Sequence, residues 1–199
     1  MTQAQEALQV EIPLSALFEK PTVGELAEHV ELELRQSQGG RVPRLVRVPR
    51  DRRIPLSFAQ QRLWFLDQLE PGSATYNIPA AVRLTGRLDV EALERTFSEV
   101  VRRHESLRTS FSLSGSDPVQ LIAEAGDVRL DVTDLSHLAE EERETEARRL
   151  IDEAAQRPFD LSAGGLHRVS LLRLSEGEHV AVLVMHHIIS DGWSMGVLI

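Results

Sequence analysis

The stretch from Ala181 to Gly196, AVLVMHHIISDGWSMG, constrains the fold of this chain more than any other stretch. It begins as an apolar run typical of a buried β-strand, and two adjacent histidines, His186 and His187, close that run. After three further residues, Asp191-Gly192 predicts a turn, and a helix is expected to follow it. The pattern therefore places titratable side chains at the end of a strand, where a cleft could open.

The two histidines are not expected to face one site, because successive side chains of a strand point to opposite faces of a sheet. His186 shares an apolar face with Val184, and His187 shares another with Met185, so alternation alone does not decide which is reactive. A single histidine is most often a hydrogen-bonded core residue. A metal site is not expected, because neighbours on opposite faces cannot chelate one ion and the chain offers neither cysteine nor a His-x-x-x-His spacing.

Composition narrows the class of protein. With 199 residues, 42% of them hydrophobic, the chain can form one globular domain and a small second piece. A formal charge of -9 argues against a nucleic-acid partner. Because cysteine is absent, a thiol in any mechanism would have to arrive on a cofactor. The chain lacks a membrane-length apolar run and a signal-peptide pattern, so we expect a cytoplasmic protein without a membrane partner.

The patterns predict a small helical segment over residues 1–34, a linker over 35–53 and a larger domain over 54–199. In the first segment, Thr22 and Glu25 form a capping-box pattern ahead of apolar residues at helical spacing. The linker is rich in arginine, glycine and proline, a composition that neither helix nor buried strand favours. Its positive charge could steer an acidic partner, although a solvated linker is the more common outcome.

The larger domain predicts a mixture of helices and strands. Ser57 and Gln60 form a second capping box, which starts a helix ending near Leu69. A strand over 76–84, a helix capped by Asp89 and a charged helix over 138–156 follow. Short strands over 107–113, 119–123 and 128–132 are expected to form an antiparallel set, and residues 166–174 pair with the histidine strand as a hairpin.

Arg62 lies at an unusual place on the first helix of this domain. Its neighbours at three and four residues in either direction are all apolar: Phe58, Ala59, Phe65 and Leu66. An arginine held on such a stripe needs a carboxylate partner, unless its side chain extends to solvent. The residues themselves leave both possibilities open.

Several stretches resemble one family. MHHIISDGWS resembles the His-His-x-x-x-Asp-Gly motif of condensation domains in nonribosomal peptide synthetases, within the chloramphenicol acetyltransferase-like superfamily. In the same order, residues 55–66 (PLSFAQQRLWFL) resemble the family's opening motif and residues 103–111 (RHESLRTSF) its second motif. Residues 10–31 resemble the last helices of a peptidyl carrier domain, but no residue here matches that domain's phosphopantetheine-bearing serine.

The resemblance implies an α/β (α+β) fold: the N-terminal lobe of a chloramphenicol acetyltransferase-like domain with a mixed or antiparallel sheet, after a small helical carrier-domain remnant. It implies that the amine of one carrier-bound aminoacyl thioester attacks another carrier-bound thioester to form a peptide bond. It assigns the catalytic role to His187, as general base or as hydrogen-bonding group. It assigns structural support of the site to His186, Asp191, Gly192 and Arg62, with Arg62 paired to Asp191 and Gly192 allowing close backbone approach.

The resemblance also implies partners and alternatives. The substrates would be tethered by 4'-phosphopantetheine on upstream and downstream peptidyl carrier domains, which act with an adenylation domain in antibiotic or other natural product biosynthesis. A C-terminal lobe would follow Ile199, so we expect a truncated chain that is inactive alone. The alternatives are a stand-alone acetyltransferase, an epimerization domain and a non-catalytic carrier-docking module. The carrier tail disfavours the first, the opening and second motifs disfavour the second, and ISDGWSMGVL favours an L-configured donor.

Overall fold

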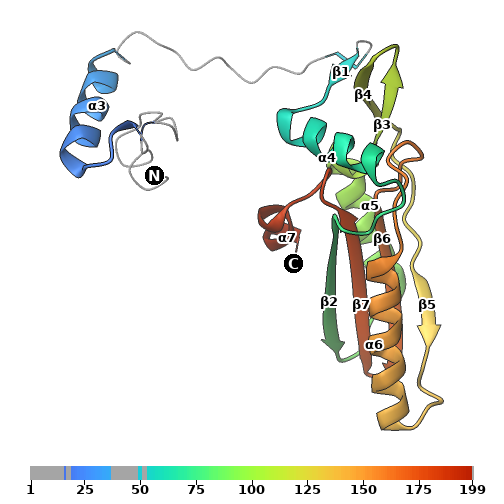
Figure 1. The fold of residues 1–199 in the computed structure, drawn as a ribbon. Coiled ribbons are helices and arrows are strands. Elements are labelled where there is room, and N and C mark those ends of the chain that lie inside the picture. The colour runs from blue at the N-terminus through green and yellow to red at the C-terminus, as the bar shows by residue number, and fades with distance from the viewer. Residues whose placement is uncertain (1–15, 17–18, 37–48, 51–52, 199) are drawn as a thin grey trace. The chain divides into compact units, whose positions relative to one another are not determined.

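A computed structural model describes residues 16, 19–36, 49–50 and 53–198 of the chain (Figure 1). It divides into two units, Met1–Pro49 and Arg50–Ile199. In the first unit, helix α3 spans Val23–Gln36, and the predicted capping box is present. The Thr22 N–H donates to Glu25 Oε2 at 3.2 Å, and the Glu25 N–H donates to Thr22 Oγ1 at 3.3 Å. Most of the predicted helical segment ahead of α3 and most of the predicted linker at 35–53 lie outside the described residues, so the boundaries at 34 and 53 stay predictions.

The second unit is built around a four-stranded sheet in the order β2-β7-β6-β5. The histidine strand β7 (Glu178–His186) lies between β2 (Asn77–Thr85) and β6 (His167–Ser175) and is antiparallel to both. The predicted hairpin of β6 and β7 is therefore confirmed. Because β7 has a neighbour on each side, hydrogen bonds along both of its edges fix the strand that ends at His186, directly before His187.

A second, smaller sheet has the order β1-β4-β3, and all of its pairs are antiparallel. Its strands span Ile54–Pro55 (β1), Asp117–Ile122 (β4) and Thr109–Ser114 (β3). The expected place of the third strand of this set is wrong: β5 (Asp131–Asp134) pairs with β6 in parallel, in the other sheet. It also begins later than predicted, because the Val128 and Leu130 N–H groups donate to side chains of α5 rather than to a strand.

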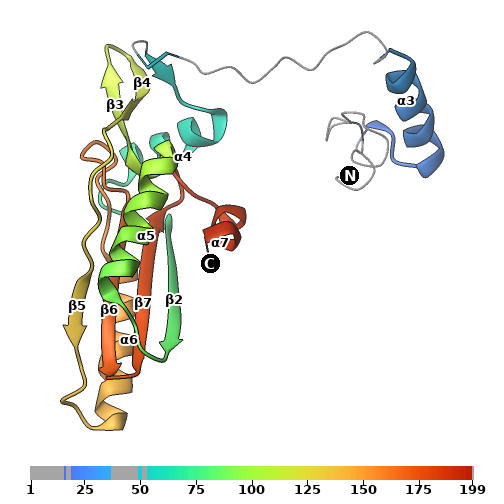
Figure 2. The ribbon, with the colours of Figure 1, turned by 180° about the vertical axis from the view of Figure 1, so that it is seen from behind.

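Two long helices cover opposite faces of the four-stranded sheet, α6 (Glu140–Gln156) on one face and α5 (Val90–Arg103) on the other (Figures 1 and 2). Leu172, Val182 and Val184 belong to the core on which α6 packs, whereas Val169, Leu183 and Met185 belong to the core under α5. The histidine strand is therefore buried on both faces. This explains why its sequence is apolar on both sides.

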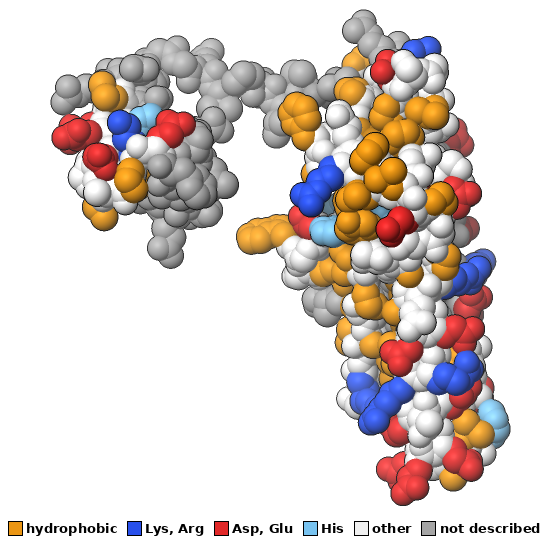
Figure 3. Space-filling view, viewed as in Figure 1, with side chains coloured by type: hydrophobic (Ala, Val, Ile, Leu, Met, Phe, Trp, Pro, Cys, Tyr) orange, Lys and Arg blue, Asp and Glu red, His pale blue; other side chains and the backbone are white. Residues whose placement is uncertain are grey.

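The remaining helices surround the end of β7 where the histidines lie. They are α4 (Phe58–Leu69), the short 3₁₀-helix η1 (Glu105–Arg108) and α7 (Gly192–Leu198). The predicted capping boxes and caps hold: the Gln60 N–H donates to Ser57 Oγ at 3.2 Å, and the Ala92 N–H donates to Asp89 Oδ1 at 2.9 Å. Hydrophobic side chains gather at the surface over α4 (Figure 3), where Phe58, Phe65 and Leu69 are exposed.

Candidate active site

The backbone N–H groups of the two histidines, at the end of β7 and directly after it, point to opposite edges of the strand. The His186 N–H donates to the Leu166 carbonyl oxygen at 2.9 Å, and the His187 N–H donates to the Tyr76 carbonyl oxygen at 2.8 Å. One bond therefore reaches toward the β6 side and the next toward the β2 side, which fixes the backbone of both residues. His186 is only 2% exposed, whereas His187 is exposed and lines a cavity. Burial thus separates two residues that the sequence pattern leaves equivalent.

His186 is a buried, neutral residue that shapes the following turn. Its Nδ1 accepts a hydrogen bond from the Ile188 N–H at 3.1 Å, and its carbonyl oxygen accepts one from the Ile189 N–H at 3.1 Å. An accepting Nδ1 requires a ring whose proton is on Nε2. Burial, with a smaller contribution from the charge of His187, lowers the pKa of His186 to about 4. The ring stays neutral at physiological pH and holds the turn closed.

His187 has a defined tautomer. Its Nδ1 lies 2.7 Å from the Ser190 carbonyl oxygen, and because a carbonyl oxygen only accepts, Nδ1 carries the proton. In the neutral ring this leaves the lone pair on Nε2. The cavity next to the ring has a volume of about 530 Å³. Its lining is formed by residues of α4, Tyr76 and the turn before α7, namely Ser57, Ala59, Gln60, Arg62, Leu63, Tyr76, His187, Ile188, Ile189, Ser190, Asp191 and Ser194.

Asp191 caps α7. Its Oδ1 accepts hydrogen bonds from the Ser194 hydroxyl at 2.6 Å and from the Ser194 N–H at 2.8 Å. These bonds, together with a smaller contribution from the charge of His187, hold the pKa of Asp191 below its usual value. Sequence reasoning missed this role, although an aspartate directly before a predicted helix start is an N-cap signal.

The predicted ion pair between Arg62 and Asp191 is wrong for this structure. Both side chains line the cavity, but among the described residues the two groups form no salt bridge. The Asp191 carboxylate points its accepting oxygen at the α7 N-terminus, and Arg62 is exposed on α4. The arginine therefore follows the alternative left open by the sequence, with its charge in solvent.

Gly192 is the first residue of α7. A Cβ built on it would meet no atom within 4 Å, so the described residues do not themselves require glycine at this position. The expectation that Gly192 permits close approach of a substrate to the backbone stays a prediction.

Two contacts of the site could not be found from residue types. The Ser190 and Tyr76 groups that bind His187 are backbone carbonyl oxygens, which every residue carries. Only the fold brings Tyr76, more than a hundred residues upstream, next to His187.

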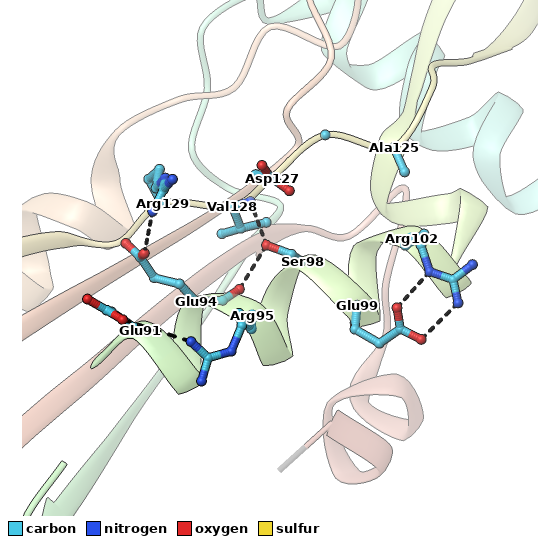
Figure 4. A pocket seen from close by; sticks show the side chains of 11 residues that line it. Glu91, Glu94, Arg95, Ser98, Glu99, Arg102, Ala125, Asp127, Val128 and Arg129 are labelled. Carbon is cyan, nitrogen blue, oxygen red and sulfur yellow. Dashed lines mark hydrogen bonds and ion pairs between the residues drawn. The ribbon is translucent and has the colours of Figure 1, made fainter. Parts of the chain in front are cut away.

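A second cavity of about 430 Å³ lies between α5 and residues 125–129 (Figure 4). Its lining is charged, but the charges pair with one another: Glu94 Oε2 lies 2.9 Å from Arg129 Nη1, and Glu99 Oε2 lies 2.6 Å from Arg102 Nε. Ser98 Oγ accepts a hydrogen bond from the Val128 N–H at 2.8 Å. These interactions attach residues 128–130 to α5, which is a structural role.

The described part of the chain contains neither a metal site nor a membrane span. Within it, no group of three or more His, Asp or Glu side chains is arranged to hold a metal ion. No helix of that part is both long and apolar enough to cross a membrane.

Two family models match the chain: "Condensation domain" matches residues 50–199, and "Phosphopantetheine attachment site" matches residues 1–30. The chain is 47% identical over 197 residues to one of the linear gramicidin synthase proteins of Brevibacillus parabrevis, a match that covers 99% of this chain and 2% of that protein. It is 43% identical over 197 residues to the dimodular nonribosomal peptide synthase of Bacillus subtilis (strain 168), covering 98% of this chain and 8% of that protein. The chain therefore spans less than a tenth of either relative.

Solved structures agree in fold. The starter condensation domain of rhizomide synthetase RzmA superposes with a TM-score of 0.68 at 26% identity, covering 74% of this chain and 35% of that one. The first condensation domain of the CDA synthetase superposes with a TM-score of 0.67 at 28% identity, covering 74% of this chain and 38% of that one.

Proposed function

Because this chain belongs to the condensation-domain family of nonribosomal peptide synthetases, we propose that residues 50–199 supply the histidine that assists peptide-bond formation between carrier-bound thioesters. Membership confirms the resemblance found in the three ordered motifs, and the match over residues 1–30 confirms the resemblance to a carrier-domain tail. The mixed α/β class and the chloramphenicol acetyltransferase-like lobe predicted from those motifs are confirmed by the solved condensation domains.

The observation that carries the proposal is the hydrogen bond between His187 Nδ1 and the Ser190 carbonyl oxygen, at 2.7 Å. Because Nδ1 donates to this carbonyl oxygen, Nε2 of the neutral ring can accept a hydrogen bond from a substrate in the cavity. Imidazole is the side chain suited to exchange a proton near neutral pH. A fixed ring also spends no free energy on reorientation when the substrate arrives.

In the proposed reaction, the amine nitrogen of the acceptor attacks the carbonyl carbon of the donor thioester. The C–N bond forms, the carbon becomes tetrahedral, and the C–S bond then breaks to release the donor's thiolate. His187 Nε2 accepts the proton that the amine loses and returns it to the departing sulfur. The same atom holds the amine N–H before attack, so one contact serves both orientation and proton transfer.

Before attack, the tautomer favours interaction with the amine over interaction with the carbonyl oxygen of the donor. An Nε2 without a proton accepts a hydrogen bond from the amine but cannot donate one to that oxygen. The group 4'-phosphopantetheine enters this scheme as the tether of both substrates on carrier domains, where its thiol forms the thioester. This chain has no cysteine of its own, which is consistent with a thiol supplied in that way.

The proposal is tested by replacing His187 in a complete condensation domain that contains this lobe, with donor and acceptor loaded on carriers and product measured by mass spectrometry. We expect His187→Ala to lower the condensation rate by about 100-fold or more. His187→Gln keeps an accepting group but cannot exchange a proton, so a smaller loss in this variant would indicate orientation rather than base catalysis. His137→Ala, a histidine on another loop, is the matched control. The parent rate in His187→Ala would refute the proposal.

A second candidate, carrier docking, is favoured by the surface of α4. Phe58 is 90% exposed, Leu69 is 62% exposed and Phe65 is 57% exposed, and Arg62 places a positive charge among them. Such a face fits a partner that offers apolar contacts and a carboxylate for Arg62. The test is to titrate a loaded carrier domain against the parent chain and against the Phe65→Ser variant. An affinity for the carrier that is equal in the two proteins would contradict docking at α4.

A further inference from the structure

We propose that Asn77 and Arg168 form a clamp that holds the C-terminal end of α6 against the histidine strand and so positions His187. Both are positioning residues, because neither lines the cavity beside His187. The functional importance of the clamp rests on the proposed role of His187, but its geometry does not.

Arg168 lies on β6, on one side of the histidine strand. Its Nη2 donates to the Arg157 carbonyl oxygen at 2.8 Å and to the Pro158 carbonyl oxygen at 2.7 Å, just past the end of α6. Its Cζ lies 3.7 Å from the centroid of the Phe159 ring, a cation–π arrangement. One guanidinium therefore binds the backbone at the end of α6 and the face of the next side chain.

Asn77 approaches the same helix end from the other side of the histidine strand. It lies on β2 directly opposite His186 in the register. Its Nδ2 donates to the Ala155 carbonyl oxygen at 2.7 Å and to the Arg157 carbonyl oxygen at 2.9 Å. The Arg157 carbonyl oxygen thus receives donors from both strands that flank β7.

The end of α6 needs such donors. The last carbonyl groups of a helix have no partner within the helix and carry its partial negative charge. A positive guanidinium and an amide N–H₂ satisfy both requirements. The two donors come from different strands, so the end of α6 is attached on both sides of the histidine strand.

Phe159 connects the clamp to the site, because its ring contacts both Arg168 and His186. Its ring meets the ring of His186 edge-on, with centroids 6.3 Å apart and an interplanar angle of 85°. His186 Nδ1 in turn holds the Ile188 N–H, and two residues later the Ser190 carbonyl oxygen binds His187 Nδ1. A shift of Phe159 therefore moves His186, the turn and finally the carbonyl that sets the tautomer of His187.

The test compares Arg168→Lys with the parent in the 199-residue chain, by ¹⁵N NMR of the imidazole rings and by thermal unfolding. Lysine keeps the charge but loses the planar fork and the stacking on Phe159. We expect the ratio of Nδ1-protonated to Nε2-protonated His187 to fall by about three- to tenfold, the change that accompanies loss of one hydrogen bond. Asn77→Ser provides a second variant and should act in the same direction. Arg173→Lys, on the same strand and exposed, is the matched control and should leave the ratio unchanged.

A lower melting temperature with an unchanged tautomer ratio would overturn the clamp, because it would show that Arg168 stabilises the fold without positioning the site. An unchanged ratio and melting temperature would overturn it as well. The NMR measurement needs no substrate, so its outcome is independent of whether His187→Ala abolishes condensation. In a complete condensation domain, Arg168→Lys should lower kcat by a factor no larger than the fall in the tautomer ratio and leave KM near the parent value.

Discussion

The stability of the sheet-containing unit should depend on pH through His186, and replacing this histidine with asparagine should remove most of that dependence. Asparagine is a matched substitution, because its Oδ1 occupies a place similar to that of Nδ1 and accepts from the Ile188 N–H. It does not titrate. The variant therefore keeps the hydrogen bond of the turn and eliminates the proton equilibrium.

The magnitude follows from the two protonation states. Folding lowers the pKa of His186 from 6.5 to about 4. Between these values the unfolded chain binds more protons than the native protein, so the free energy of unfolding falls as the pH falls. With these two pKa values, the free energy of unfolding would be about 2 kcal/mol lower at pH 5 and about 3 kcal/mol lower at pH 4 than at pH 7. We expect a loss of about 1–2 kcal/mol at pH 5.

The assay is urea denaturation at pH 7, 6 and 5, followed by tryptophan fluorescence. Both tryptophans, Trp64 and Trp193, belong to the unit that contains the sheet, so the signal reports on that unit alone. Burial also lowers the pKa of His167, which contributes a loss of the same sign in both proteins. The difference between parent and His186→Asn isolates His186. Equal pH dependence in the two proteins would refute the assignment of His186 as a buried neutral residue.

Three further outcomes are expected. Leu174→Ala should lower the free energy of unfolding by about 3 kcal/mol in urea, because Leu174 is 0% exposed, whereas Leu121→Ala, at 52% exposure, should change it by less than about 1 kcal/mol. Asp191→Ala should accelerate hydrogen exchange of the Ser194 amide, which loses its acceptor; unchanged exchange would argue against the cap. Arg62→Ala should leave the free energy of unfolding within about 0.5 kcal/mol of the parent, and a loss of several times that size would show that a carboxylate partner exists.

Local features of the fold could be predicted from the sequence because their causes lie within a few residues. The capping boxes at Ser57 and Thr22 and the cap at Asp89 each join atoms three residues apart, so the residue types alone specify the bonds. The end of α4 at Leu69 is predictable as well, since Pro71-Gly72 follows at once. Periodicity and caps thus predict helix positions close to those observed.

Features that depend on residues distant in the sequence could not be predicted from local residue patterns. Residues 128–132 look like one more short strand, but α5 side chains bind the N–H groups of Val128 and Leu130, and the strand forms at 131–134, where it pairs with β6 in parallel. The faces of His186 and His187 are equivalent in sequence because helices cover both sides of β7. The pairing of Arg62 depends on where the Asp191 carboxylate points, which the cap of α7 decides.

In the candidate site, too, some residues could be predicted from the sequence, whereas contacts that depend on the fold could not. Motif resemblance named His187, His186 and Asp191, and the structure places all three at one end of β7. The resemblance did not indicate the Ser190 carbonyl that selects the tautomer of His187, or the contacts of Arg168 with the end of α6. Backbone acceptors and cross-strand contacts have no residue-type signature, and only the register of the strands brings them to the site.

The order of the central sheet has a consequence for synthesis on the ribosome. Strand β2 pairs with β7, which is made about 100 residues later, and at a typical elongation rate of about 5–20 residues per second β2 waits about 5–20 s for its partner. During that interval its hydrogen-bonding groups along that edge lack the strand that finally covers them, which exposes the nascent chain to pairing with other polypeptides. The segment that carries the histidines thus completes the sheet, and the emergence of β7 sets the earliest moment at which this unit can become native.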